Sequence, residues 1–252
     1  MNRTVDLNCD MGESFGAYSF GADEQLMKHI TSANIACGAH AGDPNVMEDT
    51  VKLAKQNGVA IGAHPGYPDL AGFGRRKIEL TDVEIYRYVL FQIGALHAFC
   101  KAQEVPMHHV KAHGALYNVA AKKKHVAHAI AQAVADFDQN LILYGLAGSY
   151  LVEEGKRLGL RVASEVFADR TYQEDGSLTP RNTPGALIET VDQAVKQVKG
   201  MLTEGHVTSV KGKILPIQAD TVCVHGDGAS AVRFVRELKT ALQAEEILIE
   251  SM

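Results

Sequence analysis

Short runs of apolar residues alternate along this chain with longer segments whose apolar positions recur every three or four residues. Apolar runs of this length, bounded by Gly, Pro or polar clusters, are typical of strands buried on both faces of a parallel sheet. The amphipathic segments between them are typical of helices that pack on such a sheet. The pattern predicts strands at 5–9, 33–37, 59–63, 107–112, 141–146, 161–166 and 221–225.

Capping residues mark where several helices begin and end. The dipeptide Asp43-Pro44 predicts a helix start, and Gly58 predicts the end of the same helix. In "TDVE", Thr81 and Glu84 have the spacing of a capping box, which opens a long helix. Further helices are expected at 22–30, 119–135, 149–158, 187–201 and 229–243, and a hairpin at 206–217.

Strands that alternate with helices predict a parallel α/β fold. An open, doubly wound sheet is the competing architecture, and it would gather polar residues at a single switch point. Here polar residues follow nearly every strand, as in a barrel, whose loops share one mouth. We therefore expect one domain over 1–252, built as a distorted seven-stranded (β/α) TIM-like barrel, with the hairpin at 206–217 as an excursion.

Composition and charge narrow the class of protein. A chain of 252 residues with 46% hydrophobic residues can bury one substantial core. The net charge of -5 gives no basic field for nucleic acid or an anionic membrane, and no apolar run approaches the roughly 20 residues of a membrane span. The cysteines form no C-x-x-C pair, and "MNRTVDLNCD" lacks the apolar stretch of a secretory signal. We expect a cytoplasmic protein.

The residues that follow the strands carry most of the candidate chemistry. Four strands are followed by a His next to Gly, Pro or Ala, at His40, His64, His113 and His225. A single such His is usually structural, but four equivalent positions favour a shared site. The predicted mouth also contains Asp10, Glu13, Asp43, Lys111, Glu165, Asp169, Arg170 and Asp227.

The loop "GYPDLAGFGRR" lies above this mouth and ends in two cations. Arg75 and Arg76 would bind a carboxylate or phosphate through bidentate contacts, although a solvated basic pair at a loop end fits equally well. Arg181, in "GSLTPR", is a second and weaker candidate for the same role.

The motifs argue against the common nucleotide-binding loops. There is no G-x-x-x-x-G-K-[ST] or G-x-G-x-x-G loop in the sequence. Carboxylates and imidazoles remain, which favours general acid–base catalysis, with or without a divalent metal. Asp10, His40 and His64 would form a metal site, and Cys9 beside Asp10 stays open as a nucleophile.

Four long motifs, "DLNCDMGESFG", "SANIACGAHAGDP", "GAHPGYPDLAGFGRR" and "VKAHGALYN", resemble the LamB/YcsF family, and "EVFADRTYQEDGSLTPR" and "CVHGDG" extend the resemblance over essentially the whole chain. The resemblance implies a barrel related to those of glycoside hydrolases and polysaccharide deacetylases. It also implies one component of an ATP-dependent 5-oxoprolinase, which opens the lactam of 5-oxo-L-proline (pyroglutamate) to L-glutamate and releases ADP and phosphate. ATP would act as co-substrate with Mg²⁺, and two partner subunits, B and C, would be required.

Within this reaction the candidate residues divide into two groups. In a first group, Asp10 or Glu13 acts as general base, and His64 or His113 stabilises charge. Lys111, or Arg75 from the second group, holds the substrate carboxylate or the phosphoryl group. The first group is Asp10, Glu13, His64, Lys111 and His113. Binding of substrate or phosphate falls to Asn8, His40, Arg75, Arg76, Tyr117, Glu165, Asp169, Arg170 and His225. Two alternatives stay open, a metal-dependent deacetylase-like amidohydrolase and a non-catalytic subunit that binds 5-oxoproline.

Overall fold

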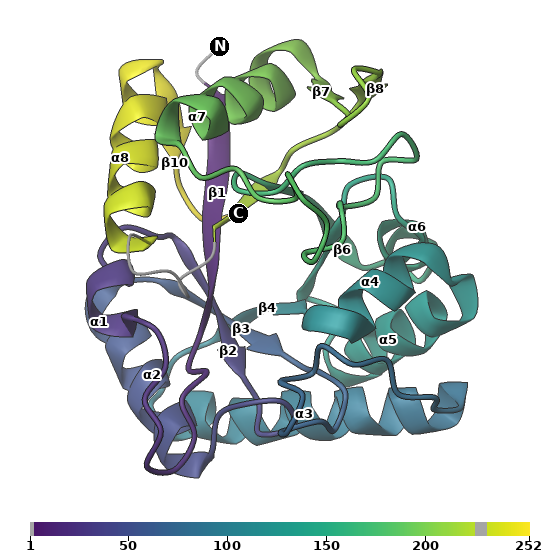
Figure 1. Cartoon of the computed structure of the whole chain (residues 1–252). Helices are drawn as coiled ribbons and strands as arrows, with labels where there is room; N and C mark the ends of the chain where they lie inside the picture. The colour runs from purple at the N-terminus through teal and green to yellow at the C-terminus, as the bar shows by residue number, and fades with distance from the viewer. Residues whose placement is uncertain (1–2, 225–230) are drawn as a thin grey trace.

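A closed barrel of parallel strands forms the centre of the protein (Figure 1). The computed structural model describes residues 3–224 and 231–252, so His225 and Asp227 lie outside the described residues. Within that part of the chain, seven strands pair in a closed ring, because the last of them pairs with the first. In ring order they are β1 (Arg3–Met11), β2 (Ser32–Ala36), β3 (Ala60–His64), β4 (Met107–Lys111), β5 (Ile142–Leu146), β6 (Arg161–Phe167) and β9 (Thr221–Val224). The prediction of a seven-stranded barrel, rather than an open sheet, is confirmed.

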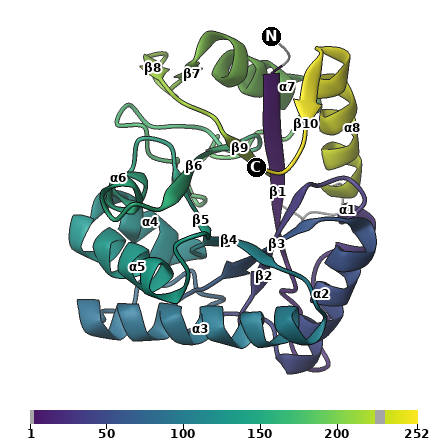
Figure 2. The ribbon, with the colours of Figure 1, turned by 180° about the vertical axis from the view of Figure 1, so that it is seen from behind.

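The first strand gives the barrel its distortion. β1 is longer than its neighbours, and its start pairs with β10 (Ile247–Ile249) while its middle pairs with β9. β10 lies between β1 and α8 (Ala231–Ala244) at the edge of the molecule (Figure 2). The sequence pattern does not predict β10, because three residues are too few to form a recognisable strand pattern.

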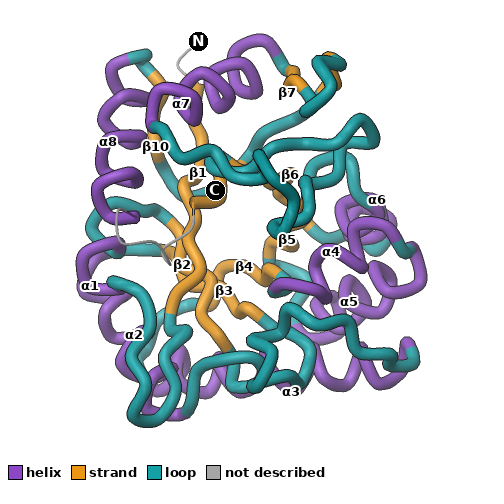
Figure 3. The backbone as a smooth tube through the Cα atoms, in the orientation of Figure 1, coloured by secondary structure: helices purple, strands orange, loops and turns teal. Residues whose placement is uncertain are grey.

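Helices surround the ring of strands (Figure 3), and the expected capping residues are found at two of these helices. Asp43 accepts hydrogen bonds from two backbone N–H groups of the first turn, and Gly58 ends the same helix in the left-handed conformation. Thr81 and Glu84 form the predicted capping box. Among the described helices we find none with the length and apolarity that crossing a bilayer requires. The remaining helices are α1 (Asp23–Leu26), α2 (Pro44–Asn57), α3 (Asp82–Ala102), α4 (Gly114–Lys122), α5 (Lys124–Phe137), α6 (Tyr150–Arg157), α7 (Val191–Lys199) and the π-helix η1 (Gly200–Glu204).

Three predicted helices have different bounds in the structure, and one of them, expected at 187–201, begins four residues later as α7. The helix expected at 119–135 is two helices, α4 and α5, because Lys123 between them has an extended backbone with φ -122° and ψ 106°. Consecutive lysines, which favour helix, hide this break in the sequence. The segment expected to be a helix at 22–30 contains only the short helix α1. β7 (His206–Thr208) and β8 (Ile214–Pro216) pair antiparallel, as expected for a hairpin.

Candidate functional site

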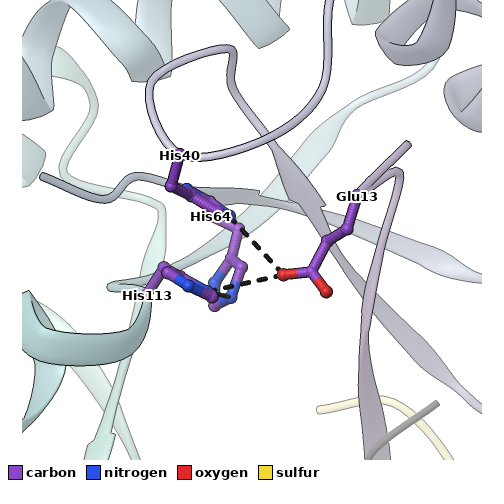
Figure 4. Close-up of side chains that lie close together, drawn as sticks. All are labelled: Glu13, His40, His64 and His113. Atoms are coloured by element: carbon purple, nitrogen blue, oxygen red, sulfur yellow. Dashed lines mark hydrogen bonds and ion pairs between the residues drawn. The ribbon is translucent and has the colours of Figure 1, made fainter. Parts of the chain in front are cut away.

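Four polar side chains meet at the carboxyl end of the barrel (Figure 4). Glu13 follows β1, His40 follows β2, His64 ends β3 and His113 follows β4. Each side chain offers one oxygen or nitrogen that could bind a metal ion, and these four atoms all lie within 4.8 Å of one another. The carboxyl ends of parallel strands share one side of a barrel, and this brings together residues that are far apart in the sequence.

The three imidazole rings and the Glu13 carboxylate are in close contact. The rings of His40 and His113 are stacked, with their centroids 3.6 Å apart and an angle of 3° between their planes. His64 Nε2 lies 2.9 Å from His113 Nδ1. Glu13 Oε1 lies 3.5 Å from both His40 Nε2 and His113 Nδ1. Asp10 borders the group, with its Oδ2 3.2 Å from His64 Nε2.

Two of these imidazoles are held in the neutral form. Burial lowers the pKa of His40 well below its usual value, and the neighbouring His113 and His64 lower it further. Burial likewise lowers the pKa of His113 to about 3, again with a contribution from His64. A neutral imidazole keeps one nitrogen lone pair, so these rings suit metal coordination.

A buried ion-pair network lies beside this group. Lys111 Nζ lies 2.8 Å from Glu165 Oε1 and 3.1 Å from both Asp10 Oδ1 and Asn8 Oδ1. Burial opposes the charge on Lys111, but the attraction of Asp10 and Glu165 outweighs it and holds the pKa of Lys111 well above its usual value. Tyr117 donates its hydroxyl to Glu165 at 2.6 Å. The ammonium of Lys111 is thus directed to groups within the protein.

Asn34 joins this network, although we did not select it from the sequence. Its Nδ2 donates to Asn8 Oδ1 at 2.8 Å and to Asp10 Oδ1 at 2.9 Å, and its Oδ1 accepts from His109 Nε2 at 2.8 Å. Asn34 belongs to β2, whose residues are all buried. A polar amide inside a strand of this kind is a usable signal, because it needs partners in the interior.

A cavity of about 650 Å³ opens beside these groups. Its lining combines carboxylates and imidazoles with several cationic side chains, which suits a small anionic molecule. All five predicted catalytic residues belong to the lining, and so do three of the predicted binding residues. These eight are Asp10, Glu13, His64, Lys111, His113, Arg75, Tyr117 and Arg170. The weaker candidate Arg181 lines the cavity as well.

The other predicted binding residues have different surroundings. Asn8 and Glu165 are fully buried and contact Lys111, so they are not part of the cavity lining. Arg76 pairs with Asp69 and also lies outside the lining. Further predicted residues that do not belong to the lining are His40, Asp169 and Asp43, the last of which caps α2.

Cys9 is a poor candidate for a nucleophile. Its side chain is buried, and burial, together with the charge of Asp10, raises the pKa of the thiol well above its usual value. The thiolate is the nucleophilic form of cysteine. A thiol that stays protonated therefore does not support nucleophilic catalysis at this position.

Comparisons with known proteins agree over nearly the full length of the chain. A model of the LamB/YcsF family matches residues 5–252. A protein of Geobacillus thermodenitrificans, named as the A subunit of 5-oxoprolinase, is 60% identical over 250 residues, which cover 99% of this chain and 97% of that protein. A protein of the same name from Staphylococcus epidermidis is 55% identical over 252 residues, with both chains covered completely (100%). The crystal structure of a lactam utilization protein from Thermus thermophilus has a TM-score of 0.93 and 44% identity, and the match covers 99% of this chain and 100% of that chain.

Proposed function

The chain belongs to the LamB/YcsF family, and we propose that it is one component of an ATP-dependent 5-oxoprolinase. Its relatives in Geobacillus and Staphylococcus are named as the A subunit of 5-oxoprolinase and match it over nearly their full lengths. The net reaction would consume 5-oxo-L-proline, ATP and two water molecules, and would yield L-glutamate, ADP and phosphate. One water opens the lactam, and the other accounts for the hydrolysis of ATP.

A five-membered lactam is an unreactive amide, so its carbonyl needs activation before water attacks. Transfer of a phosphoryl group from ATP to the lactam oxygen would make the carbonyl carbon more electrophilic. Water would then add to that carbon, the C–N bond would break, and the nitrogen would take up a proton, which leaves an acyl phosphate. The second water would cleave this acyl phosphate and release phosphate and the free carboxylate of glutamate. This chemistry needs a base for the water and cations for the negative charge that develops.

The placement of Asp10 on the cavity wall is the observation that carries the proposal. One of its oxygens accepts hydrogen bonds from Lys111 and Asn34, and the other faces His64. A carboxylate fixed in this way suits a general base, and we assign that role to Asp10. Lys111 then acts by positioning Asp10 and Glu165, since its donors are directed to groups within the protein.

Arg170 fits the role of binding an anion. It lines the cavity, is 6% exposed, and its Nε has no hydrogen-bond partner among the residues that the structure describes. A buried guanidinium N–H without a partner favours a carboxylate or phosphate as its ligand. Arg75 and Arg181 line the same cavity. We propose that Arg170 binds the carboxylate of 5-oxoproline or the transferred phosphoryl group.

We assign ATP binding to partner subunits B and C. The sequence lacks the Gly-rich loops that commonly bind the phosphates of ATP. The relatives are named as the A subunit of 5-oxoprolinase, and this name implies further subunits. ATP would enter as its complex with Mg²⁺, and the lactam would be presented to it from the cavity of this chain.

Reconstitution tests this function. Glutamate release and ADP formation are measured with 5-oxoproline and MgATP for the chain alone, for the partner subunits alone and for the mixture. We expect glutamate release coupled to ADP formation only in the mixture. An assembled mixture that forms no glutamate would contradict the assigned reaction.

A metal-dependent amidohydrolase is a second candidate, which the cluster of Glu13 with three histidines favours. Such an enzyme would hydrolyse an amide without ATP, so the same assay with Zn²⁺ and no nucleotide separates the two functions. A non-catalytic subunit would bind 5-oxoproline but would tolerate the loss of Asp10.

A further inference from the structure

We propose that Glu13, His40, His64 and His113 bind one divalent transition-metal cation, such as Zn²⁺, at the carboxyl end of the barrel. This site goes beyond the 5-oxoprolinase assignment, because the resting chain would bind the cation without substrate or ATP. Two of the ligands predicted from the sequence, His40 and His64, belong to the site, whereas Glu13 and His113 take the place of Asp10.

Two backbone carbonyls determine which nitrogen of each ring carries the hydrogen. His64 Nδ1 lies 2.7 Å from the carbonyl oxygen of Lys111, and His113 Nε2 lies 2.9 Å from that of Phe73. A carbonyl oxygen only accepts hydrogen bonds, so both of these nitrogens must donate. In neutral rings, His64 Nε2 and His113 Nδ1 therefore carry lone pairs. Metal-binding histidines are commonly oriented by carbonyl contacts of this kind.

The two lone pairs face each other. His64 Nε2 and His113 Nδ1 are 2.9 Å apart, and at this distance lone pairs repel unless a proton or a cation lies between them. A proton would join only these two atoms and would not contact His40, whose Nε2 lies 3.5 Å from Glu13 Oε1. His40 is 1% exposed, and neither of its ring nitrogens forms a hydrogen bond with the described residues. Because buried polar atoms without partners are costly, a cation that contacts all three rings is favoured.

Three distances between ligand atoms are near those of a four-coordinate site. Bonds of about 2.0–2.1 Å to a tetrahedral Zn²⁺ place neighbouring ligand atoms about 3.4 Å apart. Glu13 Oε1 lies 3.5 Å from both His40 Nε2 and His113 Nδ1, and the His64–His113 pair lies at 2.9 Å. Imidazole nitrogens with one carboxylate oxygen form a ligand set that Zn²⁺ prefers.

Glycines allow the backbone to pack directly against two of the rings. A Cβ at Gly66 would lie 2.7 Å from His40 Nδ1. A Cβ at Gly74 would lie 2.8 Å from both His113 Cδ2 and His40 Cβ. These contacts restrict the rotation of both rings.

A cation at this point would lie in the wall of the cavity, because Glu13, His64 and His113 belong to the cavity lining. There it would polarise a carbonyl or phosphoryl oxygen of a molecule in the cavity. Asp10 lies next to the site rather than in it, since its Oδ1 accepts from Lys111.

Metal binding to the isolated chain tests the site without any measurement of activity. Protein stripped with a chelator is titrated with ZnSO₄ by calorimetry, and bound zinc is counted by mass spectrometry after dialysis. We expect about one Zn²⁺ per chain, and a Tm that rises with Zn²⁺ concentration. MgCl₂ should not compete, because Mg²⁺ prefers oxygen ligands. A wild-type chain that binds no Zn²⁺ would overturn the proposal.

Variants assign the binding to these residues. His40→Ala and Glu13→Gln should each weaken Zn²⁺ binding on the order of 100-fold. His125→Ala is the matched control, because His125 is an exposed histidine that pairs with Asp82 at the surface. Circular dichroism establishes that each variant folds, and a folded His40→Ala chain with wild-type affinity would overturn the site. Where a variant does not fold, Co²⁺-loaded wild-type protein decides: the strong visible absorption of four-coordinate cobalt is expected, and a weak six-coordinate spectrum would contradict the proposal.

Discussion

Lys111 carries a positive charge inside the barrel, where its side chain is 3% exposed. It is a counter-charge to two carboxylates, Asp10 and Glu165. Lys111→Met removes that counter-charge, and we expect the free energy of unfolding to fall by about 3–5 kcal/mol. Denaturant unfolding followed by circular dichroism measures the change.

Two further variants separate the loss of charge from the loss of packing. Lys122 pairs with Asp175 at the surface, so Lys122→Met should leave stability nearly unchanged. Adding Glu165→Gln to Lys111→Met removes one of the two carboxylate charges that contacted Lys111. The double variant should therefore recover part of the lost free energy of unfolding. A Lys111→Met chain as stable as the wild type would contradict the buried ion pair.

Arg170 and Arg76 were both predicted to bind an anion, but only Arg170 lines the cavity, while Arg76 pairs with Asp69. In the assembled complex we expect Arg170→Gln to raise the KM for 5-oxoproline by about 10- to 100-fold, the size of a lost charged hydrogen bond. Arg76→Gln should leave that KM unchanged. Steady-state glutamate formation measures the KM of both variants. A larger rise in KM for Arg76→Gln than for Arg170→Gln would contradict the assignment of Arg170 to the anion site.

The sequence could indicate which residues share the mouth, because strand ends are visible in its pattern and a barrel gathers them on one side. It could not separate residues that line the cavity from those buried behind it. Asn8 Nδ2 donates to Glu165 Oε1 at 3.0 Å, across the interior between β1 and β6. That contact depends on the register of the strands, which no local pattern reveals.

Among the elements, β3 and β4 pack so closely that only glycine fits at one point. A Cβ at Gly62 would lie 2.1 Å from Nε2 of His109, a buried ring that is hydrogen-bonded to Asn34. Since this ring cannot move aside without breaking that hydrogen bond, we expect Gly62→Ala to lower the free energy of unfolding by about 1–3 kcal/mol. Urea unfolding measures the loss.

Gly94, within α3, provides the control for this substitution. Nothing lies within 4 Å of a Cβ built at this position. Gly94→Ala should therefore raise the free energy of unfolding by about 0.5–1 kcal/mol, because Ala has the higher helix propensity. If Gly62→Ala proved as well tolerated as Gly94→Ala, the close approach of β3 to His109 would be wrong.

The elements that the sequence predicted best are those with local signals. Short apolar runs located all the strands of the ring, and the caps at Asp43 and Thr81 fixed two helix starts. β10 and the break at Lys123 have no such signal. β10 depends on a tertiary contact, since it forms where the long first strand extends beyond β9.

For the molecule as a whole, buried histidines make stability depend on pH. Burial, followed by the charges of His108, Lys111 and His64, lowers the pKa of His109 well below its usual value. Below about pH 6.5 the unfolded chain takes up a proton at this residue and the folded chain does not. Stability therefore falls as pH falls, by up to about 1.4 kcal/mol per pH unit for this group.

His109→Gln removes this contribution and keeps an N–H donor for Asn34. Between about pH 7 and pH 5 the variant should lose less stability than the wild type, with chelator present throughout. Urea unfolding across this range provides the comparison. Parallel pH profiles for the two proteins would show that His109 does not stay neutral in the folded chain.

The closed barrel gathers the ends of distant strands around one cavity, and we hold that the lactam is opened there. Glutamate release by the complex assembled with Asp10→Asn is the most decisive experiment. The variant should still assemble with its partner subunits, and its kcat should fall about 100-fold or more while the KM for 5-oxoproline changes little. Wild-type turnover by an assembled Asp10→Asn complex would contradict the assignment of this cavity as the place of the reaction.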